Sequence, residues 1–455
     1  DFCLSRGLGD VYKRQVLSAA GASVGLGNIW RFPYLAAKYG GGIFLLVYII
    51  LALTFGYTLI MAETSLGRMT RKSPVGAFES FGNSRFISIG GWINAIIPIL
   101  IVPYYSVIGG WVIKYLIEYF AGHSKTLAGD AYFTTFISNG WSTEICFIIF
   151  TLFTLGIIYA GVRNGIERVS KFMMPILIVL SLIIAVYSVT RPGAIEGVKY
   201  FLVPNFDHFS WMTVVSAMGQ MFYSLSIAMG ILITFGSYMK KDTSIEKSTE
   251  NVEIFDTAIA IMAGLMIIPA VFAFSGGNAE TLKSGPALMF ITIPKVFANM
   301  GFGTAIGVVF FLLVLFAAVT SSIALTESAV STFEDELHWS RKKSTVFMGM
   351  VMLLLGTLSC LGYGPLANFK ILGMQFLDFF DFITNSVMMP IAAIATCLLV
   401  SKVVGVDKIE EEIKKDGQVF RRKKIFCFMI KYLCPLFAAI ILISSVANAF
   451  GIITM

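Results

Sequence analysis

Small and polar residues interrupt an apolar segment near the start of the chain, in the run GASVGLGNIWRFPY at residues 21–34. Such a segment is typical of a membrane helix, in which each freed backbone group costs several kcal/mol unless it is buried in protein or faces water. Carbonyls freed at a break can hold a cation, and the N-terminal end of the next half-helix can face an anion. The run therefore predicts a binding site.

A second interruption lies in the sixth apolar segment, in the run GQMFYSLSIAMG at residues 219–230. Hydroxyl-bearing and small residues again gather at the middle of a membrane-length segment, five segments after the first break. Paired breaks at matched positions are typical of inverted-repeat transporters, which bind substrate and coupling ions at mid-membrane. For either break alone, the alternative is that small residues simply let helices pack closely.

The eighth segment adds hydroxyls in the run AAVTSSIAL at residues 317–325. Adjacent hydroxyls can bond back to their own helix. Beside two broken helices, however, they offer hard oxygen ligands, which favour small hard cations over soft metals. The three histidines fall in expected loops or near helix ends, so we expect no zinc or haem site. No hydrolase or metalloprotease motif lies in the segments, and we expect no enzyme.

Charged residues inside the apolar segments narrow the mechanism. Glu63, Asp256 and Asp381 lie within or at the edge of such segments, where ionisable side chains are costly and usually functional. Arg31 follows the first break and can close a gate through a bidentate ion pair with an acid on another helix. Glu63 is expected to stabilise the broken helices without contacting the substrate or the ions itself.

The composition as a whole places these residues in a membrane protein. Of the 455 residues, 57% are hydrophobic and 13% charged, which excludes a soluble domain of this length. The net charge of +7 does not indicate nucleic-acid binding, because Lys and Arg cluster in alternate loops, as the positive-inside rule requires. The six cysteines show no CxxC pair, and no disulfide framework is expected.

Apolar stretches of about 20 residues predict the helices that must position the site. Eleven are expected, near residues 16–36, 41–67, 89–120, 141–160, 166–189, 211–239, 250–275, 303–332, 345–362, 375–401 and 425–452. Residues 1–15 form an atypical tail, and residues 402–424 are expected to be a solvated cytoplasmic loop of mixed charge. The odd helix count and the basic loops place the N-terminus in the cytoplasm and the C-terminus outside the cell membrane. No cleavable signal peptide is evident.

The three runs, with the glycines at 40–42, resemble the neurotransmitter:sodium symporter family from about residue 16 to the end. The expected number of eleven helices is similar to that of bacterial members that transport tyrosine or several hydrophobic amino acids. The resemblance implies an all-α polytopic membrane fold like that of the bacterial leucine transporter, with an inverted repeat of helices 1–5 and 6–10 and an appended eleventh helix. The first repeat would cover 16–205, the second 206–401, and the last helix 425–455.

The resemblance also implies two sodium sites. The first would use the Ser23 carbonyl, Asn28, Ser224 and Asp256, completed by the substrate carboxylate. Asn251 is the rival of Asp256 but lies closer to the charged loop. The second would use the carbonyls of Gly21, Val24 and Ala317 with the hydroxyls of Thr320 and Ser321.

Chloride is expected to be dispensable. Animal members of the family hold chloride partly through a serine one helical turn beyond the position of Asp256, and here that position is Ala260. A fixed carboxylate at Asp256 can balance the sodium charge in place of chloride.

Gly25 indicates the substrate class, because monoamine carriers of the family have an aspartate there. Its missing side chain leaves space for a substrate carboxylate, at the amides of Leu26 and Gly27 and the Tyr105 hydroxyl. The ammonium would meet the carbonyls of Ser23, Tyr223 and Ser224 and the Ser226 hydroxyl. The side-chain pocket would be formed by Ile101, Tyr105, Tyr223, Ala228, Met229, Ser321 and Leu325. Such an apolar pocket with a pliable methionine suits leucine-sized to aromatic side chains.

One departure from the family bears on that pocket. Bacterial relatives usually have glycine where Ala228 stands. The added methyl is expected to stiffen the unwound segment or to narrow the pocket.

Gate residues follow from the same resemblance. Arg31 and Asp381 would form the outer ion pair, with Tyr105 and Phe222 as an aromatic lid. On the cytoplasmic side, Gly165 and Pro175, with nine residues between them, resemble the family motif linked to local unwinding of helix 5.

The sequence thus predicts a symporter that couples sodium entry to uptake of hydrophobic or aromatic L-amino acids by alternating access. Its partners would be the amino acid and membrane lipid, and it would be a monomer or a weak homodimer. Another zwitterion, such as an osmolyte or a small amino acid, is the alternative within transport. A transport-dead amino-acid receptor or a ligand-gated channel would keep both broken helices and stays open.

Overall fold

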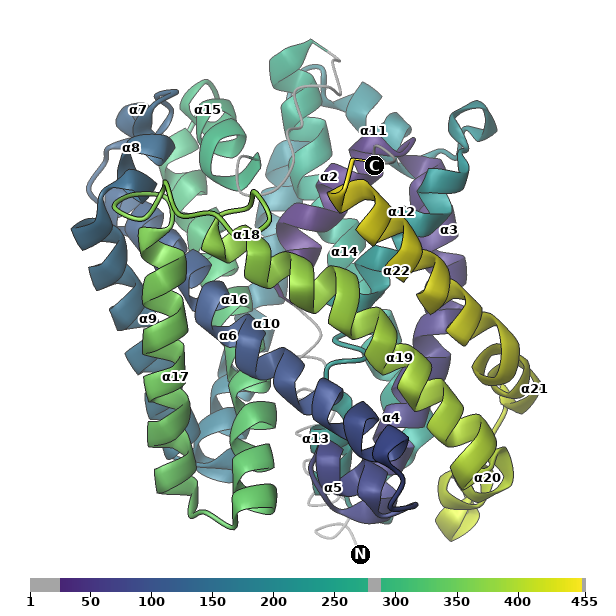
Figure 1. Ribbon diagram of the computed structural model, residues 1–455. Helices are drawn as coiled ribbons and strands as arrows, with labels where there is room; N and C mark the ends of the chain where they lie inside the picture. The colour runs from purple at the N-terminus through teal and green to yellow at the C-terminus, as the bar shows by residue number, and fades with distance from the viewer. Residues whose placement is uncertain (1–24, 277–287, 452–455) are drawn as a thin grey trace, which may run out of the picture.

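The computed structural model describes residues 25–276 and 288–451 and shows helices throughout these ranges (Figure 1). Nine helices in the described ranges are long and apolar enough to span a membrane, from Gly42–Thr70 to Lys423–Ala449. The first and sixth expected segments are the two outside this count, because the first is described only from residue 25 and the sixth is divided in its middle. The eleven expected segments are therefore consistent with the structure.

The bounds of the helices follow the predicted segments closely. The α-helices are α2 (Phe32–Lys38), α3 (Gly42–Leu51), α4 (Tyr57–Thr70), α5 (Pro74–Glu79), α6 (Arg85–Phe120), α7 (Ser124–Leu127), α8 (Tyr132–Ser138), α9 (Gly140–Tyr159), α10 (Glu167–Val189), α11 (Ala194–Leu202), α12 (Trp211–Ser224), α13 (Ile231–Tyr238), α14 (Ile245–Ser275), α15 (Ile293–Ala298), α16 (Gly303–Leu337), α17 (Arg341–Leu361), α18 (Phe376–Asp381), α19 (Met389–Leu398), α20 (Val406–Ile413), α21 (Lys423–Phe428) and α22 (Cys434–Ala449).

Several spans contain wider π-helical turns, some between two consecutive α-helices and others at the start or the end of one. These turns are Gly27–Arg31, Ala52–Gly56, Val162–Ile166, Leu288–Thr292, Phe382–Met388, Leu399–Val404 and Met429–Leu433. Two short 3-10 turns, Phe206–His208 and Lys415–Gly417, complete the described elements. Such π turns inside helices are frequent at functional sites, and the first of them lies in the first broken segment.

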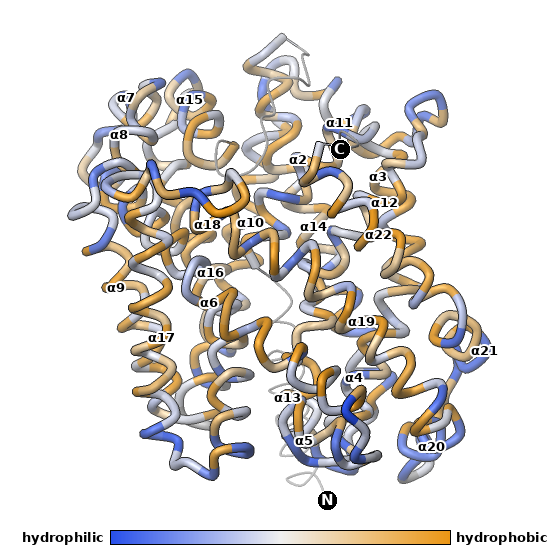
Figure 2. Tube along the Cα trace, viewed as in Figure 1, coloured by the Kyte–Doolittle hydropathy of each residue, from blue (hydrophilic) through white to orange (hydrophobic). Residues whose placement is uncertain are grey.

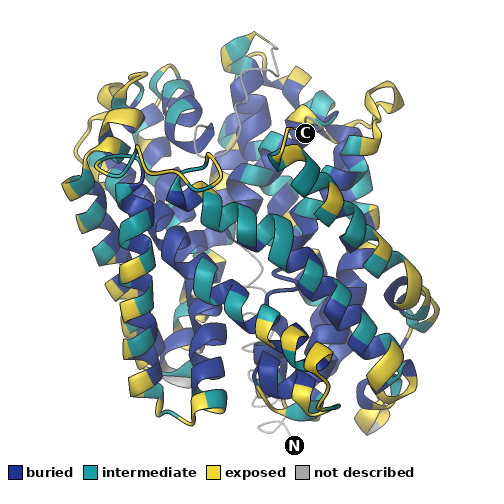
Figure 3. Cartoon of the chain, viewed as in Figure 1, coloured by how far each residue is buried: buried dark blue, intermediate teal, exposed yellow. Residues whose placement is uncertain are grey.

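Apolar residues make up the long middle parts of the spans, and hydrophilic residues gather at their ends (Figure 2). Buried residues line the centre, where α6 packs along α16, and exposed residues mark the outer faces of α9 and α17 (Figure 3). The close approach of α6 and α16 depends on Gly307, because a Cβ there would lie 2.1 Å from the Tyr119 ring.

The second span and the inner half of the sixth pack backbone to backbone. A Cβ at Gly67 of α4 would lie 2.0 Å from the carbonyl oxygen of Ile233, and one at Gly236 of α13 would lie 2.6 Å from that of Thr64. Small residues at such crossings let membrane helices approach closely. Glu63, one turn before Gly67, consequently lies beside the start of α13.

The structure corrects the expectation of a solvated loop over residues 402–424. This segment contains α20, which buries its apolar residues Val406, Ile409 and Ile413. Glu412 of α20 accepts a hydrogen bond of 2.7 Å from Arg68 Nε, and both side chains are at most 4% exposed. Burial alone would raise the pKa of Glu412, but hydrogen bonds from Lys415 and Arg68 hold that pKa below its ordinary value. Within this segment, α20 docks against the protein because its apolar residues lie on one face.

Candidate functional site

The described part of the first broken segment begins with a bend at Gly25 and becomes helical within two residues. The Gly25 amide donates to Asn28 Oδ1 at 3.2 Å, and a π-helical turn starts at Gly27. A Cβ at Gly25 would lie 2.4 Å from Ser321 Oγ, and one at Gly27 would lie 2.2 Å from the Tyr223 ring. A side chain at either position would therefore crowd the neighbouring residue on α16 or α12. The predicted site residues Gly21, Ser23 and Val24 lie outside the described residues.

The second break is confirmed by the structure. Helix α12 ends at Ser224 and α13 begins at Ile231, and between them Ser226 and Ala228 have φ values of 54° and 58°. A left-handed conformation costs an L-residue about 1–2 kcal/mol, so neighbouring contacts must hold it. The Ala228 amide donates to Glu63 Oε1 at 2.7 Å, which agrees with the expected supporting role of Glu63.

A buried polar cluster joins the two breaks to α14. Asn28 Nδ2 donates to Ser224 Oγ at 3.0 Å and to Asp256 Oδ1 at 2.7 Å. Ser224 Oγ donates to Asp256 Oδ1 at 2.5 Å, and the Tyr48 hydroxyl donates to Asp256 Oδ2 at 2.7 Å. Asp256 is fully buried in this cluster, whereas the rival Asn251 is half-buried.

The charge of this cluster favours a cation. Burying a carboxylate is costly unless it is paired, and no Lys, Arg or His among the described residues pairs with Asp256. Its hydrogen-bond partners are all neutral, namely Ser224, Asn28 and Tyr48. The structure thus brings together three of the four residues predicted for the first sodium site, and it adds Tyr48, which the sequence reasoning missed. A hydroxyl in an otherwise apolar stretch of α3 is the signal that was available.

Three of the five ligands predicted for the second ion site are described. Ala317, Thr320 and Ser321 lie buried on α16. Thr320 Oγ1 donates to the carbonyl oxygens of Phe316 and Ala317, each at 3.1 Å. These oxygens offer hard ligands of the predicted kind, and the two remaining predicted ligands precede residue 25.

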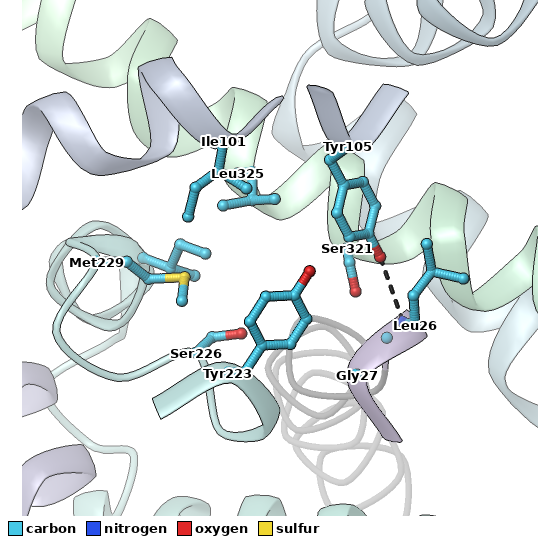
Figure 4. Close-up of a pocket in the computed structure, with 11 residues that line it drawn as sticks. Leu26, Gly27, Ile101, Tyr105, Tyr223, Ser226, Met229, Ser321 and Leu325 are labelled. Atoms are coloured by element: carbon cyan, nitrogen blue, oxygen red, sulfur yellow. Dashed lines mark hydrogen bonds between the residues drawn. The ribbon is translucent and has the colours of Figure 1, made fainter. Parts of the chain in front are cut away.

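A cavity lies where the two breaks meet α6 and α16 (Figure 4). It encloses about 380 Å³ of space outside protein atoms, counting the part that opens to its surroundings. Its lining consists of Gly25, Leu26, Gly27, Ile101, Tyr105, Tyr223, Ser226, Met229, Ile231, Ser321 and Leu325. The Leu26 amide donates to the Tyr105 hydroxyl at 3.3 Å, the dashed line in Figure 4.

Most of the predicted substrate residues line this cavity, but three of those that the structure describes, Phe222, Ser224 and Ala228, do not. Phe222, predicted as part of the lid, is turned away and packs edge-on against Phe55, with ring centroids 5.5 Å apart. Tyr223 is the aromatic residue of α12 that lines the cavity, because successive helical residues point about 100° apart. Ser224 belongs to the polar cluster. Ala228 is buried outside the lining, so its methyl does not narrow the cavity.

The lining also contains a residue that the sequence analysis did not select. Ile231 is the first residue of α13, directly after Gly230, whose φ is 71°. The point at which the helix restarts decides which side chain faces the cavity, and the sequence gives that point only approximately.

The structure does not show the predicted outer gate in its closed form. Arg31 and Asp381 make no ion pair in this structure: the Arg31 guanidinium lies 5.3 Å from the centre of the Tyr223 ring. Asp381 instead accepts hydrogen bonds from the Tyr104 hydroxyl, at 3.2 Å, and from Asn385. The outer ion pair stays a prediction for another conformation.

Helix 5 likewise shows no unwinding here. Gly165 lies in the π-helical turn Val162–Ile166, which continues directly into α10 with Pro175 inside it. The Gly165 amide donates to the Gly161 carbonyl oxygen at 2.8 Å. Unwinding at this motif also stays a prediction.

Comparisons with known proteins identify relatives of the whole chain. Residues 12–150 and 133–452 match the family model described as the sodium:neurotransmitter symporter family. The chain is 32% identical over 442 residues to a Bacillus subtilis protein named uncharacterized sodium-dependent transporter YhdH, covering 96% of each. It is 30% identical over 447 residues to an uncharacterized sodium-dependent transporter of Haemophilus influenzae, covering 94% of this chain and 96% of that protein. The fold is similar to the crystal structure of MhsT in complex with L-phenylalanine, with a TM-score of 0.85, 33% identity, and coverage of 95% of this chain and 98% of that one.

Proposed function

Because this chain belongs to the sodium:neurotransmitter symporter family of sodium-dependent membrane transporters, we propose that it imports hydrophobic or aromatic L-amino acids together with sodium. The observation that supports this most is the position of the cavity. It lies between the two broken helices, directly beside the buried cluster of Asn28, Ser224 and Asp256. A substrate and a coupling ion bound there would share one mid-membrane site, as alternating access requires.

The cavity wall supports an α-amino acid with a large apolar side chain. Ile101, Met229, Ile231 and Leu325 form the apolar side of the lining. At the opposite side, the Leu26 amide donates to the Tyr105 hydroxyl at 3.3 Å, a long hydrogen bond that a carboxylate can replace with a stronger one. The related structure solved with L-phenylalanine agrees with this size of side chain.

Two sodium ions would travel with the substrate. We assign the first to the cluster around Asp256, where a cation would supply the positive charge that the neutral partners do not. The second would use Ala317, Thr320 and Ser321 with Gly21 and Val24.

Transport is proposed not to need chloride. Ala260, one turn after Asp256, is fully buried and offers no hydroxyl that could hold chloride. The Asp256 carboxylate would instead supply the negative charge beside the first sodium ion. Sodium-driven uptake by proteoliposomes with chloride replaced by gluconate should equal uptake in chloride. A strict chloride requirement would refute this part of the proposal without touching the substrate class.

Orientation follows from charge. We place the end of the molecule that bears α5, α20 and the start of α17 (Figure 1) in the cytoplasm, because the basic residues Arg71 and Lys72 precede α5 and the basic residues Arg341, Lys342 and Lys343 begin α17. The C-terminus would then lie outside.

The decisive experiment is sodium-dependent binding of a panel of labelled amino acids to the purified protein. We expect leucine, methionine, phenylalanine and tyrosine to bind, and Asn28→Ala to weaken both sodium and substrate binding. Asn299→Ala, at an amide that bonds only to the Lys295 carbonyl near the molecular surface, is the control and should bind normally. Unchanged affinity in Asn28→Ala would contradict the ion site. Counterflow of labelled substrate in proteoliposomes then separates a transporter from a receptor, which binds without exchange.

A further inference from the structure

A cleft outside the transport pathway lies where α9 ends and α17 begins. It is lined by Tyr159, Trp339, Ser340, Lys342, Lys343, Val346, Phe347 and Met350, and encloses about 750 Å³, counting space open to its surroundings. Helices α9 and α17 run side by side on one outer edge of the molecule (Figure 1). In the proposed orientation this end of both helices meets the cytoplasmic face of the membrane.

Two lysines stand at the rim of the cleft. Lys343 Nζ lies 3.9 Å from the centre of the Trp339 ring, and Lys342 Nζ lies 5.7 Å from that of Tyr159. Neither lysine forms an ion pair with a described residue. The neighbouring Arg341 differs, because it pairs with Glu327 and Glu334. The rim therefore presents two uncompensated positive charges held in place by aromatic rings.

Further along α17 from the lysines, one face of the helix is apolar and exposed at the surface of the protein. Val346, Met350 and Leu354 follow Lys342 at steps of four residues, which puts them on the same side of the helix. They are 58%, 57% and 68% exposed. From Lys342 to Leu354 the helix rises about 18 Å, comparable to one leaflet of a hydrocarbon core about 30 Å thick.

We propose that this cleft binds a phospholipid with an anionic phosphate headgroup from the cytoplasmic leaflet. Lys342 and Lys343 would hold the phosphate, and an acyl chain would lie along Val346, Met350 and Leu354. The complementary charge selects an anionic headgroup, and the adjoining apolar stripe selects a lipid over a soluble anion. Trp339 and Tyr159 lie at the depth where aromatic residues are enriched in membrane proteins. The assignment to the cytoplasmic leaflet rests on the proposed orientation, whereas the preference for an anionic headgroup rests only on the two lysines.

Native mass spectrometry of the full purified chain in detergent tests this site. We expect phosphatidylglycerol to bind about tenfold more tightly than phosphatidylcholine with the same acyl chains, since each lysine near a headgroup contributes several-fold. The double variant Lys342→Gln with Lys343→Gln should lose this preference. The matched control is Lys408→Gln with Lys424→Gln, which removes two exposed lysines and the same net charge elsewhere at that end. The control should keep the preference.

Three results would overturn the proposal. Equal binding of the two lipids by the unmodified chain would show that the rim does not select charge. An equal loss in the control would show that net charge alone decides. Equal competition by glycerol phosphate, which has the headgroup phosphate without acyl chains, would indicate a soluble anion as the occupant. Unchanged melting temperatures for both double variants would show that the chain remains folded.

Discussion

Replacing Gly25 by alanine tests how the first break and α16 meet at the proposed site. The added methyl would lie 2.4 Å from Ser321 Oγ, 3.3 Å from Ser321 Cβ and 3.4 Å from the Tyr105 hydroxyl. The first of these distances is far inside van der Waals contact, so either the Ser321 side chain or the backbone at residue 25 must move. Overpacking of this kind costs about 1–3 kcal/mol, which corresponds to about a 5- to 150-fold loss of substrate affinity.

The same distances predict a partial rescue. Ser321→Ala removes the oxygen that the new methyl meets and leaves only Cβ, at 3.3 Å, which a small shift relieves. The loss of substrate-binding free energy in the double variant should therefore be smaller than the sum of the losses in the two single variants. Gly219→Ala is the control, because a Cβ there has nothing within 4 Å. We expect this control to bind as the unmodified chain does.

The assay is equilibrium binding of labelled L-phenylalanine to all four proteins of the cycle. Sodium should be present in large excess, so that the lost hydroxyl of Ser321 does not appear as weak sodium binding. Additive effects, within about 0.5 kcal/mol, would refute the reasoning, because they would mean that the methyl at position 25 and the Ser321 oxygen do not meet.

The remaining predictions concern the docked helix α20 and the second break. Glu412→Gln breaks the buried ion pair with Arg68 at a cost of about 3–5 kcal/mol. Amide hydrogen exchange in α20 should therefore accelerate about a hundredfold or more. The control is Glu411→Gln, at the exposed neighbouring position, which should leave the exchange rates unchanged. Because the pKa of Glu412 is held below its ordinary value of 4.5, the pair stabilises the fold fully above that pH, and its contribution is lost as the pH falls through the folded-state pKa. Exchange of α20 amides, corrected for intrinsic rates, should thus rise only in acid. Ala228→Gly relieves about 1 kcal/mol of left-handed strain without touching the cavity lining, so the ranking of amino acids in uptake should stay the same; a reordered ranking would contradict the assigned lining.

The spans and the second break were predictable from the sequence because their signals are local. The expected helix at 89–120 corresponds to α6, Arg85–Phe120, and the expected break within 219–230 lies between Ser224 and Ile231. In both cases a long apolar run fixes the helix, and small or hydroxyl residues at mid-membrane mark the interruption. The carboxylate at Asp256 was also visible, since a charge inside such a run stands out.

Side-chain direction at a broken helix was not predictable. Phe222 and Tyr223 are adjacent aromatic residues, and which of them faces the cavity depends on the helical phase at the end of α12. The docking of residues 402–424 was hidden for another reason. Charged residues dominate that segment, and the apolar face of α20 has only a few members. The partners of Arg31 and Asp381 were also missed, because Arg31 lies against the Tyr223 ring and Asp381 accepts hydrogen bonds from Tyr104 and Asn385.

The glycine contacts between α4 and α13 limit how the molecule can move. Gly67 and Gly236 bring the two backbones so close that a side chain at either position would collide with the backbone of Ile233 or Thr64. Because this close packing joins α4 to α13 over a full turn of each helix, we expect an opening on that side to displace both helices together. Spin labels placed on α4 and α13 would keep one separation through a transport cycle, even while each changes its distance to α16.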